Sequence, residues 1–263
     1  MQFSKIIIFS FCVQFLISSQ KTFAQAEDSI ALQTITDTTI AAHKKTTKAE
    51  LKKYIVPAVL FTYGLVTPSI KGLNKLDLDI KKSTLDANAY KKTKIDNYTQ
   101  YAPMASVYAL NLMGYKGKNN LRDATVILLT SKIISTAGAK SIKYLSKRLR
   151  PDSSSNNSFP SGHTTEAFAN ATFLFEEYKH KNIWIGIAGY AVAAASGYLR
   201  IYNNKHWLSD VVAGAGLGIA STEFAYWLYP KFSKRLFKSK ANSTVLLPNY
   251  GNGVFSMNYV RWF

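Results

Sequence analysis

The chain has 263 residues, of which 47% are apolar, 18% are charged and one is a cysteine. The apolar fraction excludes a disordered chain, and the single cysteine excludes both a disulfide-rich scaffold and a zinc site built from thiolates. Lysine and arginine outnumber aspartate and glutamate by 33 to 15, a formal net charge of +18. The partners are therefore expected to be anionic: phosphates, nucleic acid or acidic lipid surfaces.

The start of the chain has the pattern of a secretory signal peptide. Lys5 precedes an apolar run over residues 6–17, and a small-x-small sequence follows at residues 24–26. The run is shorter than the roughly 20 residues that a membrane-spanning helix needs, and an uncleaved membrane anchor is the alternative. We predict a signal peptide over residues 1–26 and export to the periplasm or cell envelope, which argues against nucleic acid as the anionic partner.

Helical segments dominate the rest of the chain. Residues 27–53 are polar and rich in Thr and Lys, which indicates a linker. The next part, residues 54–230, contains apolar segments whose lengths and Ala, Leu and Ile content favour helices over strands. The segments are Tyr54–Ile70, Tyr101–Tyr115, Leu121–Lys147, His163–Tyr178, Asn182–Leu199 and Leu208–Tyr229. They predict an all-α domain, a bundle of about six helices.

Two regions outside these segments have their own signals. A lysine-rich connector separates the first two segments, and we interpret it as a solvated basic loop, the alternative being a docking patch for anionic lipid. The C-terminal tail, residues 231–263, contains Asn252-Gly253, a strong signal for a two-residue hairpin turn. We expect a small C-terminal β-hairpin there.

The predicted helices are only partly compatible with a membrane interior. Asn182–Leu199 and Val211–Tyr229 approach the length of a membrane-spanning helix. Lys132, however, lies near the middle of one predicted helix, and Glu166 lies within another. This pattern favours a soluble or membrane-associated bundle, with an integral inner-membrane protein as the alternative.

Three short stretches carry the residues suited to chemistry, each at the end of one predicted helix or the start of another. They are Lys143–Pro151, Pro160–His163 and Arg200–Asp210. Arg150 and Arg200 offer planar guanidinium groups that bind phosphate oxygens in pairs, and Lys143 offers a point charge. Lys143 and Arg150 are about two helical turns apart, so both project from one face.

The second and third stretches complete a site for a phosphate ester. Pro160–His163 leads into a helix whose first N–H groups and dipole favour an anion; Gly162 permits close approach, and Ser161 adds a hydroxyl group. If the last helix begins by His206, His206 and Asp210 are adjacent on its surface, and the carboxylate can then accept from one ring nitrogen and leave the other as a nucleophile. His163 fits a general acid. Each residue alone has an ordinary structural interpretation, but their combination indicates this site.

The combined pattern resembles the type 2 phosphatidic acid phosphatase superfamily, which also holds bacterial class A acid phosphatases and vanadium haloperoxidases. The family pattern is Lys-x6-Arg-Pro, then Pro-Ser-Gly-His, then Ser-Arg-x5-His-x3-Asp, and the resemblance covers residues 54–230. Leu199 stands where the family has serine, and the loop over residues 152–159 is short and polar. Neither departure removes a residue that we assign to chemistry.

The resemblance implies a helical bundle with the phosphate site at one end. It implies a phosphohistidine on His206, with Asp210 behind it, and His163 as the acid and later the base. The phosphate would be held by Lys143, Arg150, Ser161, Gly162 and Arg200. It implies neither a metal nor another cofactor.

We therefore predict an exported, metal-independent phosphohydrolase acting on lipid phosphates or pyrophosphates, such as phosphatidate, prenyl pyrophosphate or lipid A, at a membrane surface. The alternatives are a soluble, non-specific acid phosphatase acting on small phosphate esters, a vanadate-dependent haloperoxidase, and a phosphate-binding module without catalysis.

Overall fold

The structure is a computed structural model, and it describes residues 51–87, 92–236, 244–251 and 254–261. The helices are α3 (Ile55–Val66), the 3-10 helix η2 (Thr67–Ser69), α4 (Lys71–Ala87), α5 (Asp96–Thr99), α6 (Ala102–Leu112), α7 (Leu121–Ser146), α8 (Gly162–Tyr178), α9 (Ile183–Tyr202) and α10 (Leu208–Leu236). The all-α prediction is confirmed, and the six predicted segments correspond to α3 and α6 to α10. The predicted signal peptide lies outside the described residues.

A two-stranded antiparallel sheet follows the helices. Its strands, β1 (Thr244–Gly251) and β2 (Val254–Arg261), pair with Gly251 opposite Val254. They flank Asn252-Gly253, the dipeptide at which the sequence predicts the hairpin turn.

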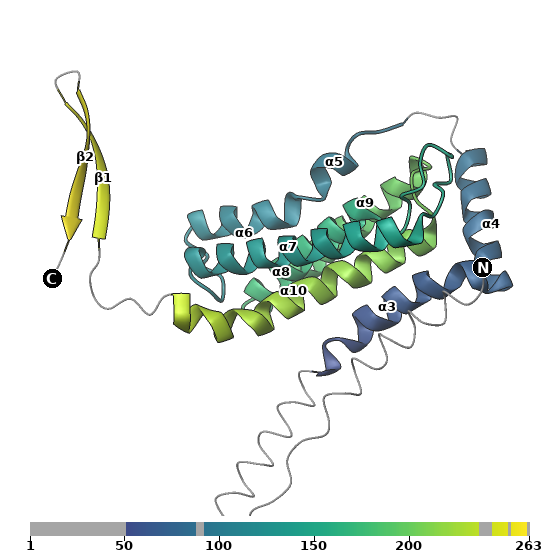
Figure 1. Ribbon diagram of the computed structural model, residues 1–263, viewed down its shortest axis with the longest axis horizontal. Coiled ribbons are helices and arrows are strands. Elements are labelled where there is room, and N and C mark those ends of the chain that lie inside the picture. Colours follow the sequence, from purple (N-terminus) through teal and green to yellow (C-terminus); the bar gives the residue numbers. More distant parts are fainter. Residues whose placement is uncertain (1–50, 88–91, 237–243, 252–253, 262–263) are drawn as a thin grey trace, which may run out of the picture. The chain divides into compact units, whose positions relative to one another are not determined.

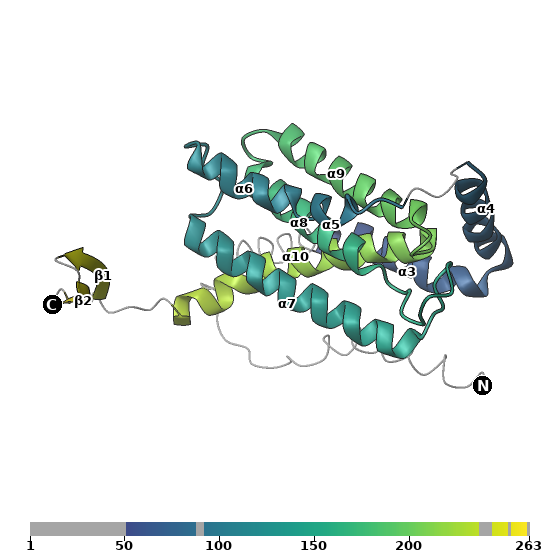
Figure 2. The ribbon, with the colours of Figure 1, turned by 90° about the horizontal axis from the view of Figure 1, so that it is seen from above.

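The sequence predicts a solvated loop for the lysine-rich connector, but most of the connector is helical. It forms α4 and the one-turn helix α5. Leu73, Leu76 and Ile80 recur at helical spacing among the lysines, which provides the apolar period that the lysine content obscures. A bend of 93° separates Lys71–Thr84 from Ile55–Ser69, and α4 stands across one end of the long helices (Figures 1 and 2).

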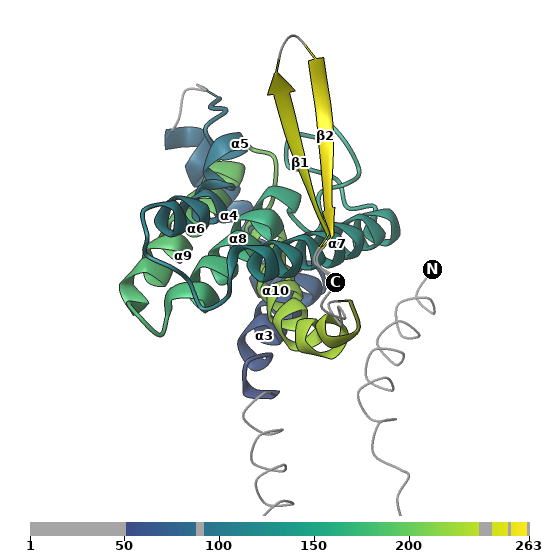
Figure 3. The same ribbon diagram turned by 90° about the vertical axis from the view of Figure 1, so that its left-hand side faces the viewer.

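Helix α8 is the centre of the bundle. It contacts α6, α7, α9 and α10, and Figure 3, which looks along the bundle, shows these helices around it. Its Phe173, Leu174 and Tyr178 form a buried cluster with Val107 of α6 and Leu128 of α7. Because consecutive long helices run antiparallel, the α7–α8 and α9–α10 connections lie at the same end, beside α4 (Figure 1).

Glycines allow α8 and α10 to approach closely. A Cβ at Gly218 would lie 2.3 Å from the carbonyl oxygen of Thr165 and 2.8 Å from the backbone nitrogen of Ala169. A Cβ at Gly214 would lie 2.7 Å from the carbonyl oxygen of Ser161. This packing brings the beginning of α8, which carries the second motif stretch, against α10, which carries the end of the third.

One helix within the described part of the chain, Leu208–Ser233, is long and apolar enough to cross a membrane, and half of its most apolar window is buried in the protein. Ile55–Ser69 and Lys71–Thr84 meet the same criterion only as a bent pair. Helix α9, which covers most of the predicted segment Asn182–Leu199, does not meet this criterion.

The close packing of α8 on α10 predicts opposite outcomes for two glycine substitutions. Gly218→Ala should lower the free energy of unfolding by about 1–3 kcal/mol, because the new methyl group overlaps the α8 backbone. Gly72→Ala adds a methyl group with nothing within 4 Å, and it should raise that free energy by about 0.5–1 kcal/mol through helix propensity. Denaturant unfolding of both variants checks this; equal effects would contradict the packing.

Candidate active site

The three motif stretches meet at the end of the bundle beside α4. Six of the eight predicted residues occupy helix ends: Lys143 the last turn of α7, Ser161 the N-cap of α8, Gly162 and His163 its first two positions, Arg200 the last turn of α9, and Asp210 the first turn of α10. Arg150 and His206 lie outside the helices, in the α7–α8 and α9–α10 connections, because α7 ends at Ser146 and α10 begins at Leu208. Neither Lys143 and Arg150 nor His206 and Asp210 therefore share a helix face, contrary to the expectation from their spacing. The backbone N–H of Ser161 donates to the carbonyl oxygen of Asp210 at 3.0 Å, which joins the second stretch to the third.

The cationic side chains of Lys143, Arg150 and Arg200 lie close enough in this site to repel one another. Burial, followed by the charges of Arg150 and Arg200, lowers the pKa of Lys143 to about 8. Burial and the charge of Arg200 also lower the pKa of Arg150. The Nε atoms of both arginines are buried, without a hydrogen-bond partner in the described part of the chain. A bound anion would reduce the repulsion among these cations and accept hydrogen bonds from the unpaired Nε atoms, so the geometry suits a phosphate group.

Backbone carbonyls from the short loop before α8 hold Lys143. Its Nζ donates to the carbonyl oxygens of Asn157 and Pro160, at 2.6 Å each. The Cε atom of Lys143 would lie 3.8 Å from a Cβ at Gly162. The ammonium group is thus fixed beside the first turn of α8, whose N–H groups have no partner within the helix.

Arg200 is held by a carboxylate from a distant segment. Its Nη1 forms an ion pair with Oδ2 of Asp96, a buried residue of α5. Asn203 Nδ2 donates to the other oxygen of Asp96 at 3.3 Å. The guanidinium is therefore fixed in orientation.

The ring of His206 is oriented by a backbone carbonyl. Its Nδ1 lies 2.8 Å from the carbonyl oxygen of Ser158 and 3.7 Å from Oδ2 of Asp210. The sequence predicts Asp210 as the direct acceptor of this proton, whereas the carbonyl oxygen of Ser158 is the nearer one. Because a carbonyl oxygen only accepts, Nδ1 carries the proton and Nε2 holds the lone pair. Burial lowers the pKa of His206 to about 4, so the ring is neutral near pH 7.

Asp210 joins several segments through its carboxylate. Oδ2 accepts from Ser158 Oγ at 2.5 Å and from the backbone N–H of Trp207 at 3.0 Å. Oδ1 accepts from Nη1 of Arg148 at 2.8 Å. Burial raises the pKa of Asp210, but the interactions with His206, Arg148 and Ser158 outweigh burial, and the net pKa is lowered. Asp210 is thus ionised at neutral pH.

His163 faces the same cations from the first turn of α8. Its Nε2 lies 2.8 Å from Oδ1 of Asn97 on α5. Burial and the charges of Arg200, Arg150 and Lys143 lower the pKa of His163 to about 4, against the opposing charge of Asp96. Negative charge placed among these cations would raise that pKa again.

Several residues of the site are not among those predicted from the sequence. Arg148 lies inside the first stretch, but nothing in the sequence distinguishes it from the neighbouring Lys147. Ser158 acts partly through its backbone carbonyl, which leaves no sequence signal. Asp96 and Asn97 belong to the connector that we expected to be a solvated loop.

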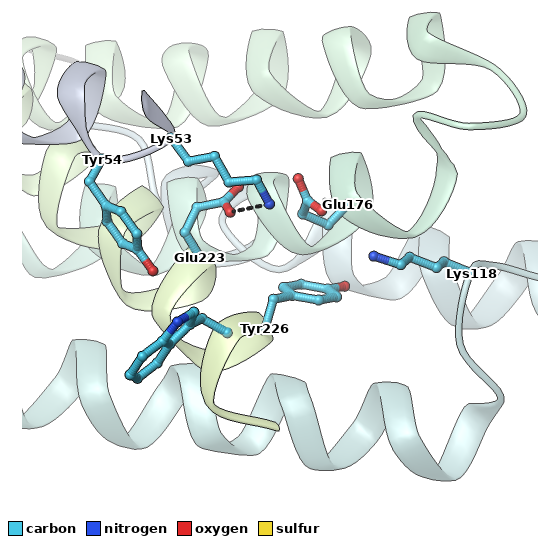
Figure 4. Close-up of a pocket in the computed structure, with 7 residues that line it drawn as sticks. Lys53, Tyr54, Lys118, Glu176, Glu223 and Tyr226 are labelled. Atoms are coloured by element: carbon cyan, nitrogen blue, oxygen red, sulfur yellow. Dashed lines mark ion pairs between the residues drawn. The ribbon is translucent and has the colours of Figure 1, made fainter. Parts of the chain in front are cut away.

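A separate pocket forms at the C-terminal end of α8, whereas the site lies at its N-terminal end. It is lined by Lys53, Tyr54, Lys118, Glu176, Glu223, Tyr226 and Trp227, and it contains none of the predicted site residues. Figure 4 shows Lys53 directed toward Glu223, with which it forms an ion pair at 3.5 Å. Across the described ranges, no group of three or more His, Cys, Asp and Glu residues has the arrangement of a metal site.

Known proteins are similar to the part of the chain that carries the candidate active site. Residues 124–234 match the family model of the PAP2 superfamily. A lipid A 1-phosphatase of Porphyromonas gingivalis is 38% identical over 170 residues, covering 62% of this chain and 37% of that protein. The bacitracin transport permease protein BcrC of Bacillus licheniformis is 40% identical over 78 residues, 30% of this chain and 36% of that protein. The chain thus spans little more than a third of these curated relatives.

Among solved structures, the crystal structure of Aquifex aeolicus LpxE is similar with a TM-score of 0.46 and 22% identity. The similarity covers 58% of this chain and 95% of that one.

Anion binding at this site should be coupled to proton uptake. Sulfate stays a dianion near neutral pH, so any proton taken up on binding goes to the protein. We expect sulfate to bind more tightly as the pH falls from about 7 to about 5, because the dianion raises the pKa of His163. Titration calorimetry in buffers of different ionisation enthalpy measures the uptake.

His163→Asn should remove most of this proton uptake. His180→Asn, the same change at an exposed histidine just beyond α8, should leave it unaltered. Unchanged uptake in His163→Asn would assign the titrating group elsewhere.

Proposed function

Because this chain belongs to the PAP2 superfamily, we propose that it is a metal-independent phosphohydrolase that removes phosphate from phosphorylated lipids through a phosphohistidine on His206. The observation that carries the proposal is the state of this buried ring: Nδ1 donates to the carbonyl of Ser158, and Nε2 keeps its lone pair. A neutral nucleophile next to three cations suits in-line attack on a phosphate ester.

In the first step, Nε2 of His206 attacks phosphorus and the bond to the leaving oxygen breaks. Protonated His163 gives its proton to that oxygen, and the negative charge of the bound substrate favours this protonated state. The transferred group's oxygens are stabilised by Lys143, Arg150 and Arg200. The phosphorylated ring still carries the Nδ1 proton and is positive, which the carboxylate of Asp210, 3.7 Å from Nδ1, stabilises.

In the second step, water attacks the phosphohistidine. His163 is now neutral and accepts a proton from the water, which restores its protonated state. The bond between phosphorus and Nε2 breaks, and inorganic phosphate leaves. His206 returns to its neutral form with the proton on Nδ1, and Gly162 and Ser161 complete the cradle at the first turn of α8.

A lipid substrate is supported by one relative and by the surface around the site. The curated relative with 38% identity is named as a lipid A 1-phosphatase. Tyr144 and Leu145, next to Lys143 in the chain, are 77% and 67% exposed, and Tyr98 of α5 is 77% exposed. Exposed apolar side chains on the elements that carry the site suit acyl chains better than a small soluble ester. Lipid phosphates and pyrophosphates of the lipid A type are the proposed substrates.

The proposal extends to location. We infer that the enzyme is exported through the signal peptide over residues 1–26 and works at a membrane surface. Lys71, Lys75 and Lys82 of α4 are exposed beside the site's end of the bundle, where anionic lipid would attract them.

Phosphate release by the purified chain tests the function. The substrates are a micellar lipid A 1-phosphate and 4-nitrophenyl phosphate. We expect release from the lipid, with a higher kcat/KM than for the aryl ester. His206→Ala should lower the rate by at least about 1,000-fold, as loss of a nucleophile does, and His180→Ala should keep the wild-type rate within about twofold.

Three outcomes would count against the proposal in different ways. Equal kcat/KM for both substrates would favour a non-specific acid phosphatase. Activity retained in His206→Ala would remove the phosphohistidine. Anion binding without release from either substrate would favour a binding module.

A further inference from the structure

Asp77 of α4 is a buried carboxylate that lies outside all three motif stretches. Its side chain has no exposed surface, although α4 is otherwise a largely exposed, lysine-rich helix. Oδ1 accepts from the backbone N–H of Ser209 at 3.0 Å, and Oδ2 accepts from the hydroxyl of Ser209 at 2.5 Å. Asp77 therefore binds the first turn of α10, one residue before Asp210, and satisfies an N–H that the helix itself leaves without a partner.

Arg148 connects the same carboxylate to Asp210. Nη2 of Arg148 donates to Oδ2 of Asp77 at 2.9 Å, and Nη1 donates to Oδ1 of Asp210 at 2.8 Å. Nη1 also donates to the hydroxyl of Ser209 at 2.7 Å. One planar guanidinium thus spans two buried carboxylates, a geometry that a lysine ammonium cannot reproduce.

A second contact from α4 fixes the same region. Nζ of Lys81, one turn after Asp77, donates to the carbonyl oxygen of Pro151 at 2.8 Å and lies 5.2 Å from the centre of the Trp207 ring. The guanidinium of Arg148 lies 5.6 Å from the same ring. Helix α4 therefore holds both the end of the first stretch and the residue that follows His206.

We propose that Asp77 is a positioning residue of the phosphatase centre, which acts through Arg148 and Ser209 to fix the carboxylate of Asp210 and thereby the ring of His206. This inference rests on the proposed function. Without Asp77, Arg148 loses one of its two anchors, and the start of α10 loses its acceptor. The nucleophile is then less well aimed at phosphorus, whereas Lys143, Arg150 and Arg200 still bind the phosphate group.

The variant Asp77→Asn tests this, with Asp79→Asn as its matched control. Asp79 lies two residues further along α4, is exposed, and undergoes the same change in charge. We expect Asp77→Asn to lower kcat by about 10- to 100-fold, as misplaced reacting groups do, with KM changed by less than about twofold. Asp79→Asn should leave both constants within about twofold of wild type.

Two further readouts separate positioning from a general loss of structure. Vanadate mimics the five-coordinate transition state, so Asp77→Asn should weaken inhibition by vanadate about tenfold while inhibition by inorganic phosphate stays within about twofold. Because Asp77 acts partly through Arg148, the loss of kcat in the double variant Asp77→Asn/Arg148→Gln should be smaller than the product of the losses in the two single variants.

The outcomes distinguish this inference from the proposed function. A wild-type chain that releases no phosphate contradicts the function. An active wild type in which Asp77→Asn equals Asp79→Asn, or in which the effects of the two single variants multiply, overturns only the role of Asp77. Arg148→Lys keeps the charge but cannot span both carboxylates, so it should also lower kcat. A wild-type kcat in Arg148→Lys overturns the inference even where Asp77→Asn fails to fold.

Discussion

Asp210 accepts hydrogen bonds from Arg148, from the hydroxyl of Ser158 and from the backbone of Trp207, so one buried carboxylate joins the first motif stretch, the loop after it and the start of α10. The same loop supplies the carbonyl of Ser158 that orients His206. Asp210 therefore supports the nucleophile chiefly by fixing the segment that aims it, in addition to its charge 3.7 Å from Nδ1. A shift of this carboxylate would disturb the loop and the ring together.

The packing of the bundle makes this arrangement possible. Glycines on α10 bring α8 close enough for the Ser161 N–H to bond with the Asp210 carbonyl. Two further helices, α5 and α4, then neutralise part of the positive charge: α5 pairs Asp96 with Arg200, and α4 pairs Asp77 with Arg148. The site keeps enough cationic character to bind an anion. Both histidines are neutral near pH 7 before the anion binds.

The sequence was sufficient to predict the bundle, and it also selected eight residues that the fold brings to one end of it, because residue types suited to phosphate chemistry recur there at a characteristic spacing. Their roles in catalysis stay predictions. The sequence was insufficient for the supporting groups, for three physical reasons. The carbonyl of Ser158 belongs to the backbone, which every residue has. Asp77 and Asp96 contact residues more than 70 positions away, and local patterns do not encode such pairing. The lysines around Asp77 favour a solvated loop on composition, although the leucine spacing of α4 is helical.

The central claim is that His206 becomes phosphorylated during turnover. The most direct test uses 4-nitrophenyl phosphate carrying a radioactive phosphoryl group, because its leaving group needs little help from a general acid, and the His163→Asn variant, in which hydrolysis of the intermediate is slowed. After a brief reaction stopped with alkali, we expect an acid-labile, alkali-stable label on the peptide that contains His206, and none in the His163→Asn/His206→Ala double variant. A label on another residue, or an equal label in the double variant, would show that His206 is not the phosphorylated group.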